Sequence, residues 1–142
     1  LCYDTRVELD EEGGDMTTVL VVDDDRDTVF LIRSYLEAEP GIRVLQAFNG
    51  YDAIQVAEAE SPDLILLDIG LPGGDGHTVL ARLQSLGSMA AIPVIVLSAM
   101  EPAAHVDRMK SAGAVAYFQK PADNARLLAE IRKALGETVP QG

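Results

Sequence analysis

Three consecutive aspartates, Asp23, Asp24 and Asp25, follow four apolar residues in the stretch VLVVDDD. Adjacent like charges repel one another, and carboxylates held within a few ångströms cannot all stay ionised without a positive counter-charge. A hard divalent cation supplies that charge, and a set of oxygen ligands without histidine or cysteine favours Mg²⁺. The stretch therefore predicts a magnesium site, provided that the fold brings several acids to one place.

Further polar residues stand where other apolar runs end. Asp68 follows LILL, Ser98 follows VIVL, and Lys120 follows AYFQ. A carboxylate beside Mg²⁺ can attack phosphorus and form an acyl phosphate, while an ammonium and a hydroxyl can bind the phosphoryl oxygens. Asp68 is the best candidate for the nucleophile, because its run should form the central strand and the loop sequence IGLPGGDG follows it directly.

Short β-branched runs alternate along the chain with segments of helical spacing, which predicts βα repeats. The strands are expected at Val19–Asp23, Ile42–Ala47, Leu64–Asp68, Val94–Leu97 and Val115–Phe118. The apolar stripes of the helices are expected at Phe30, Leu31, Ile32, Tyr35 and Leu36; Ala53, Ile54 and Ala57; Val79, Leu80, Leu83 and Leu86; Val106 and Met109; and Leu127, Leu128, Ile131 and Leu135. The pattern indicates an α/β fold with a five-stranded, doubly wound parallel sheet covered on both faces.

The carboxyl ends of parallel strands form the crevice of such a sheet. The acids after the first and third strands, Ser98 and Lys120 are therefore expected to converge on one rim. The sequence has no GxGxxG after the first strand and no GxxxxGK[ST], so this rim is not built to cradle a nucleotide. Acids after a strand can also cap the next helix, and this is the expected role of Asp25 and Asp27.

Length and composition indicate one domain with a full core, since the chain has 142 residues of which 48% are hydrophobic. We divide it into an acidic tail or linker at 1–16, which holds six acids and one arginine, a domain at 17–136, and a frayed end at 137–142. The net charge of −12 argues against direct binding to nucleic acid. A single cysteine, the lack of a signal peptide and the lack of a membrane-spanning apolar run favour the cytoplasm.

In combination, the motifs resemble the receiver domain of bacterial two-component response regulators and are similar to its single-domain chemotaxis type. The resemblance covers Thr17 to Leu135 and is specific because four motifs occur in the expected order and at the expected separations. VLVVDDD places the family's acidic pair at Asp23 and Asp24, LILLDIGLPGGDG places the phosphoacceptor at Asp68, VIVLSA places the switch hydroxyl at Ser98, and AYFQKP places the lysine and the switch aromatic at Lys120 and Tyr117.

The resemblance implies a role for each matching residue. Mg²⁺ would be bound by Asp24, Asp68 and the carbonyl of Gly70, with Asp23 acting through water. The phosphoryl group would be bound by Ser98, Ala99 and Lys120, and Ser98 with Tyr117 would form the switch. The family also implies the flavodoxin-like strand order 2-1-3-4-5.

Partners follow from the same resemblance. The phosphodonor would be a phosphohistidine on a sensor histidine kinase or a histidine phosphotransfer protein, and the domain would catalyse only its own phosphorylation and dephosphorylation. The fourth helix, fifth strand and fifth helix, about Pro102 to Leu135, would form a surface for partners and for a homodimer.

Two other functions compete with this interpretation. An aspartate-nucleophile phosphatase of the haloacid-dehalogenase type needs a second Asp two residues after the nucleophile, and Gly70 stands there. A degenerate receiver would bind partners without phosphorylation, but the sequence retains Asp24, Asp68, Ser98 and Lys120 together. Gly70 also replaces the polar side chain that many relatives carry, which leaves the dephosphorylation rate open.

Overall fold

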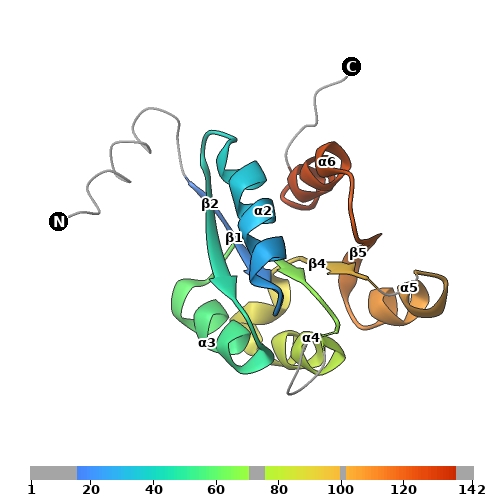
Figure 1. Ribbon diagram of the computed structural model, residues 1–142. Coiled ribbons are helices and arrows are strands. Elements are labelled where there is room, and N and C mark those ends of the chain that lie inside the picture. Colours follow the sequence, from blue (N-terminus) through green and yellow to red (C-terminus); the bar gives the residue numbers. More distant parts are fainter. Residues whose placement is uncertain (1–15, 71–75, 100–101, 137–142) are drawn as a thin grey trace.

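Five parallel strands form one sheet, with helices on both of its faces (Figure 1). The computed structural model describes residues 16–70, 76–99 and 102–136. The strands are β1 (Thr17–Val22), β2 (Ile42–Ala47), β3 (Leu64–Leu67), β4 (Val94–Ser98) and β5 (Ala114–Gln119), in the order β2-β1-β3-β4-β5. The helices are α2 (Arg26–Glu37), α3 (Gly50–Glu60), α4 (Gly76–Ser85), the 3₁₀ helix η1 (Gly87–Ala91), α5 (Pro102–Ser111) and α6 (Asn124–Ala134). The predicted doubly wound α/β fold and its flavodoxin-like strand order are confirmed.

The sheet separates two apolar cores. Helices α2 and α6 cover one face, and α3, α4 and α5 cover the other (Figure 1). Successive side chains of a strand point to opposite faces, so Leu20 and Val22 enter the core of α3 to α5, while Val19 and Val21 enter the core of α2 and α6. Burial on both faces explains why the central strands are unbroken apolar runs.

Side-chain caps fix where three of the helices begin. The Asp25 carboxylate accepts a hydrogen bond from the Asp27 amide at 3.0 Å, which starts α2 immediately after β1. Asn49 caps α3 by accepting from the Asp52 amide at 2.8 Å, and Asp123 caps α6 in the same manner. Asp25 therefore has the predicted capping role, because its carboxylate satisfies amides that the helix leaves free.

The predicted apolar stripe of α2 is wrong at two positions. Phe30 and Leu31 are 65% and 67% exposed, whereas Val29 and Leu36 are the buried residues of this helix. Residues seven apart lie on one face of a helix, and each step along the chain turns the side chain by about 100°. Once Val29 and Leu36 face the sheet, Phe30 and Leu31, which follow Val29, must turn toward solvent.

The structure does not describe the acidic segment 1–15, the loop 71–75, Met100 or the end 137–142, nor the side chains of His77 and His105. Within the described residues, no helix combines the length and the apolar character that a bilayer span requires.

Candidate functional site

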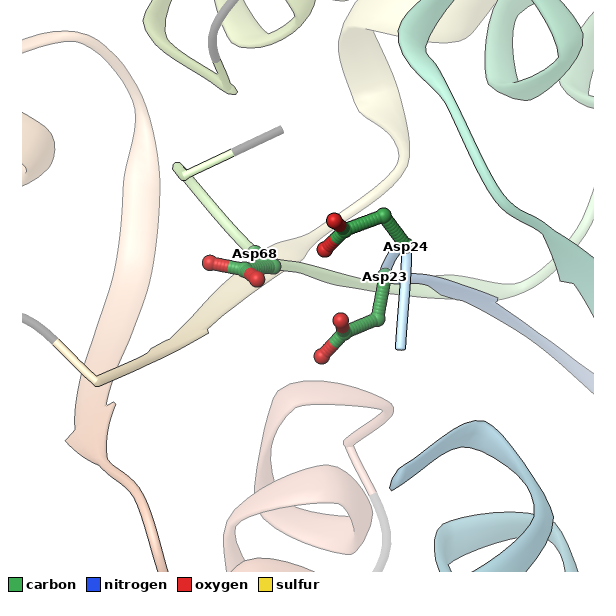
Figure 2. Close-up of side chains that lie close together, drawn as sticks. All are labelled: Asp23, Asp24 and Asp68. Carbon is green, nitrogen blue, oxygen red and sulfur yellow. The ribbon is translucent and has the colours of Figure 1, made fainter. Parts of the chain in front are cut away.

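Three carboxylates lie together at the carboxyl ends of two neighbouring strands (Figure 2). Asp23 and Asp24 follow β1, and Asp68 follows β3. One carboxylate oxygen of each residue lies within 4.8 Å of the others. Asp23 is 3% exposed and Asp68 is 9% exposed, while Asp24 faces solvent. The fold thus brings together the acids that the strand-end argument had selected.

Lys120 directly follows the carboxyl end of β5 and brings one positive charge into this cluster. Its ammonium donates hydrogen bonds to Asp23 Oδ2 and, at 3.3 Å, to Asp68 Oδ2. The Lys120 amide donates to the Ser98 carbonyl at 2.8 Å, which holds the start of this loop against the end of β4. Among the described residues, these two acids are the ion-pair partners of Lys120, and Asp24 is not one of them.

The pKa values of Asp23 and Lys120 are both shifted by burial and by the pairing of the two side chains. Burial raises the pKa of the Asp23 carboxyl, and its hydrogen bonds with Lys120 and the Asp25 amide offset this only in part. Burial lowers the pKa of Lys120, but its hydrogen bond with Asp23 and the charges of Asp68 and Asp23 outweigh burial, so the net direction is upward. Among the described residues, the cluster thus holds three carboxylates and one paired ammonium, which contacts two of them.

A hydroxyl pair lies beside the acids on the face of the sheet covered by α3 to α5. Ser98 ends β4 and is 1% exposed, and Tyr117 on β5 is half-buried against the same core. Burial raises the pKa of the Tyr117 phenol, with a smaller contribution from the charge of Asp68, while a side-chain hydrogen bond with Ser98 acts in the opposite direction. Tyr117 and Ser98 are therefore already in contact in this structure.

Two backbone positions complete the rim. Gly70 is exposed, and its amide donates to Asp68 Oδ1 at 2.9 Å, which fixes the orientation of that carboxylate. Ala99 is exposed and directly follows Ser98. Each predicted site residue is thus found at the carboxyl end of the sheet or, for Tyr117, on the strand that leads to it.

Comparison with known proteins assigns the family. Residues 19–132 match the family model described as the response regulator receiver domain. The chain belongs to this family. Protein PilH of Pseudomonas aeruginosa is 34% identical over 120 residues, covering 84% of this chain and 98% of PilH. Sporulation initiation phosphotransferase F of Bacillus subtilis is 34% identical over 122 residues, covering 86% and 93%.

Solved receiver structures have the same fold. A CheY-like receiver domain protein from Methanospirillum hungatei has a TM-score of 0.79 at 28% identity, covering 86% of this chain and 95% of the other. The receiver domain of a sensor histidine kinase from Pseudomonas aeruginosa, solved with a magnesium ion in its active site cleft, has a TM-score of 0.76 at 28% identity, covering 86% and 99%. The chain is a receiver domain of two-component phosphorelay signalling.

Some curated relatives are much longer than this receiver. The chain spans 52% of the KDP operon transcriptional regulatory protein KdpE of Escherichia coli, to which it is 38% identical over 120 residues covering 84% of the chain. It spans 57% of a second transcriptional regulator, from Pseudomonas aeruginosa. The shared part is therefore the receiver.

One residue that supports the backbone beside Asp68 was not among the site residues predicted from the sequence. Gly76, the first residue of α4, donates its amide to the Ile69 carbonyl at 2.9 Å. A Cβ atom at this position would lie 2.3 Å from Ile69 Cα and 2.7 Å from the Asp68 carbonyl oxygen. Only glycine allows α4 to start this close to the backbone of Asp68 and Ile69. The sequence feature that could have identified it is its place as the last glycine of the loop sequence IGLPGGDG.

Replacing Lys120 with methionine should strongly destabilise the metal-free receiver. The substitution keeps much of the apolar stem but leaves the buried Asp23 carboxylate without its ammonium. Removing one partner of a buried ion pair costs about 3–5 kcal/mol, and the partial exposure of Lys120 places the expected loss near the lower end. The check is urea unfolding at neutral pH with a metal chelator present.

Two further variants separate this effect from loss of charge in general. Lys133→Met removes an exposed lysine and should change the free energy of unfolding little, while Asp23→Asn placed in the Lys120→Met background should restore much of the loss. Since the Lys120 pKa is raised from 10.5, its stabilisation is present at neutral pH and is lost as pH rises above 10.5 through the folded-state value. Equal losses for Lys120→Met and Lys133→Met would contradict the pairing.

Proposed function

We propose that this receiver accepts a phosphoryl group on Asp68 from a phosphohistidine donor, in a Mg²⁺-dependent reaction, and thereby changes a partner-binding surface. The observation that carries the proposal is the setting of the Asp68 carboxylate. Its Oδ2 lies 3.3 Å from Lys120 Nζ, and two further carboxylates lie within 4.8 Å on the neighbouring strand end. An acceptor oxygen, an oxygen-rich cation site and a fixed ammonium are the parts that aspartyl phosphorylation needs.

The donor set fits magnesium. The carboxylates of Asp23, Asp24 and Asp68 would hold the ion together with the Gly70 carbonyl, and all of these ligands are oxygens. When bound, Mg²⁺ supplies positive charge that stabilises the phosphoryl oxygens during transfer. The excess of carboxylate over ammonium in the site supports this assignment, because the cluster needs such a charge even before a donor arrives.

The protein's own residues define the transfer step. An ionised Asp68 oxygen attacks phosphorus, a P–O bond forms as the P–N bond to the donor imidazole breaks, and the electron pair of that bond remains on the imidazole nitrogen. The Gly70 amide holds Asp68 Oδ1 and so limits rotation of the nucleophile. After transfer, Lys120, the Ser98 hydroxyl and the Ala99 amide would bind the phosphoryl oxygens.

The proposed donor is a sensor histidine kinase or a histidine phosphotransfer protein, the classes with which receiver domains interact. The proposed setting is the cytoplasm, and direct binding to nucleic acid is not expected at a net charge of −12. We treat the receiver as a regulatory domain that catalyses only its own phosphorylation and dephosphorylation.

Incubation with Mg²⁺ and acetyl phosphate or phosphoramidate tests this function directly. Mass spectrometry of the intact chain should show one added phosphate that is labile to base and to hydroxylamine, as an acyl phosphate is. No uptake with Mg²⁺ present would reject the proposal. Continuous hydrolysis of a phosphate ester, with no stable phosphoprotein, would instead favour the phosphatase alternative.

Ser98→Ala should separate phosphorylation from signal output. The phosphoryl group adds three strong acceptor oxygens near Ser98, and a Ser98 hydroxyl that turns to donate to one of them would alter its contact with Tyr117. Beryllofluoride, which stands in for the phosphoryl group, should shift the amide NMR signals around Ser98 to Met109 and around Tyr117. In Ser98→Ala, phosphate uptake should persist while these distant shifts become much smaller. The full wild-type pattern of shifts in Ser98→Ala would remove Ser98 from the switch.

A further inference from the structure

Strand β2 forms one outer edge of the sheet, because it stands first in the strand order (Figure 1). On its inner side, the carbonyls of Gly41 and Ala47 accept hydrogen bonds from amides of the β1 segment at 2.7 and 3.1 Å. The peptide groups of alternate residues in a strand point to the same side. Every second peptide group of β2 therefore faces outward, where β1 cannot pair it. These outward groups, which we call the β2 edge, belong to Ile42, Val44 and Gln46.

Two amides of the β2 edge are already bonded to the end of α2 and the turn that follows it. The Val44 amide donates to Oε2 of Glu37 at 3.0 Å, and the Ile42 amide donates to the Glu39 carbonyl at 3.4 Å. The second carboxylate oxygen of Glu37, Oε1, accepts from Arg33 Nε at 3.1 Å. Both oxygens of Glu37 are thus engaged. One of them occupies the place from which a further strand would accept the Val44 amide.

Glu37 stands where the helix itself does not favour an acid. It is the last residue of α2, and the last turn of this helix contains no basic residue. Negative charge is unfavourable at a helix C-terminus, and a basic residue four positions before an acid is the weaker order for such a pair. These local effects give no reason for a carboxylate at this position, whereas its hydrogen bond with Val44 gives it a role in the sheet.

The helices beside β2 cover its two faces but not its edge. Val44 packs into the core of α2 and α6, and Leu45 and Ala47 pack into the core of α3 to α5. Gln46 is exposed. In the part of the chain that the structure describes, Glu37 is the side chain that bonds to a peptide group of the β2 edge. Edge strands are commonly blocked by a charged residue, because an open edge can pair with another chain.

We propose that Glu37 caps the β2 edge and thereby prevents β2 of a second copy of this chain from adding to the sheet. A strand edge is complementary to itself when two copies run antiparallel about a two-fold axis. With the axis beside Val44, each Val44 amide would donate to the Val44 carbonyl of the other copy, and each Gln46 amide to the other Ile42 carbonyl. The Glu37 carboxylate already holds the first of these amides, so the pairing requires that the cap be removed.

Three variants separate the cap from the charge and from the ion pair. Glu37→Met keeps a long stem without an acceptor, Glu37→Gln keeps an acceptor oxygen without the charge, and Arg33→Met removes only the ion pair. Amide hydrogen exchange is followed by NMR on the full chain at the lowest workable protein concentration. No phosphodonor is present, so the outcome does not depend on phosphorylation of Asp68. The Val44 amide should exchange about ten-fold faster in Glu37→Met, because loss of one hydrogen bond of ordinary strength shifts local opening by about that factor. In the other two variants its rate should stay close to that of wild type, and the Leu45 amide, which faces β1, should keep its rate in all three.

Sedimentation equilibrium of the same variants over a range of concentrations measures the pairing itself. Glu37→Met should self-associate at least about ten-fold more tightly than wild type or Glu37→Gln, and its Val44 amide should regain protection as the dimer forms. Gln46→Pro placed in the Glu37→Met background should abolish this gain, because proline lacks the amide that faces outward and leaves the ladder with β1 intact. Glu37→Ala, which also lacks an acceptor and favours the helix, repeats the test with a second side chain.

Any of four results would overturn the proposal. Unchanged exchange of the Val44 amide in both Glu37→Met and Glu37→Ala would show that the carboxylate does not protect it. Equal acceleration in Glu37→Met and Arg33→Met would assign the effect to the ion pair. Wild-type self-association in Glu37→Met and Glu37→Ala, despite a faster Val44 amide, would show that the cap does not control pairing. A dimer that survives Gln46→Pro would lie on another surface of the molecule.

Discussion

The Asp68→Asn variant is expected to take up no phosphate under conditions in which the wild-type receiver takes up one per molecule. An amide oxygen is a far weaker nucleophile than a carboxylate, so the acyl phosphate cannot form. The variant should still fold, because an asparagine oxygen can accept the 2.9 Å hydrogen bond from the Gly70 amide. It also removes a like charge from the Asp23 and Asp24 cluster. Loss of uptake would then reflect chemistry at one oxygen atom and not loss of the fold.

Asp25→Asn is the matched control for this experiment. Asp25 belongs to the same acidic run, but its carboxylate caps α2, and asparagine is an equally good cap. The control should therefore keep both its melting temperature and its phosphate uptake. If Asp68→Asn were phosphorylated by acetyl phosphate at the wild-type rate, the acceptor would be another residue. If Asp25→Asn lost uptake as well, the run after β1 would have a role beyond capping.

The site could be predicted because parallel strands deliver their carboxyl ends to one rim. The acids at 23, 24 and 68 follow buried strands, and a parallel sheet leaves no other place for them. The capping role of Asp25, as distinct from the expected metal site of Asp23 and Asp24, could be predicted for a similar reason. A helix that begins directly after β1 requires a residue that caps it. These inferences need only the period of the apolar residues and the positions where each run ends.

Other features depend on distances that a linear pattern does not contain. The sequence shows that Lys120 follows β5, but not that its side chain reaches past the end of β4 to Asp23 and Asp68 and leaves Asp24 aside. The contact of Gly76 with the backbone of Asp68 depends on how closely α4 approaches β3. Phe30 and Leu31 were assigned to the core because an apolar residue in a helix is ambiguous until the rotation of that helix is known.

The position of Lys120 leads to the second large effect. Because Lys120 pairs with Asp23 and Asp68, Asp24 is the acid of the cluster that lacks an ammonium partner among the described residues. Mg²⁺ should therefore stabilise the wild-type receiver markedly, and Asp24→Asn should remove most of that gain. At a Mg²⁺ concentration of about 100 times the Kd, binding stabilises the folded state by about 2.7 kcal/mol. Without metal, Asp24→Asn should melt slightly higher than wild type, because one repulsive charge is gone.

Thermal melts with Mg²⁺ and with a chelator, at several pH values, measure both parts. Burial raises the Asp23 pKa above 3.8, so in metal-free buffer the contribution of Asp23 to stability increases as pH falls through the raised folded-state value. Mg²⁺ needs ionised ligands, so its stabilisation decreases over the same pH range. The curves with and without Mg²⁺ should thus converge at acid pH for wild type and lie close together throughout for Asp24→Asn.

Glu58→Gln, which removes an exposed charge on α3 away from the cluster, should behave as wild type. An Asp24→Asn variant that melts below wild type in chelator would show that Asp24 is not a source of repulsion. A variant that keeps the full Mg²⁺ shift would show that Asp24 is not a ligand.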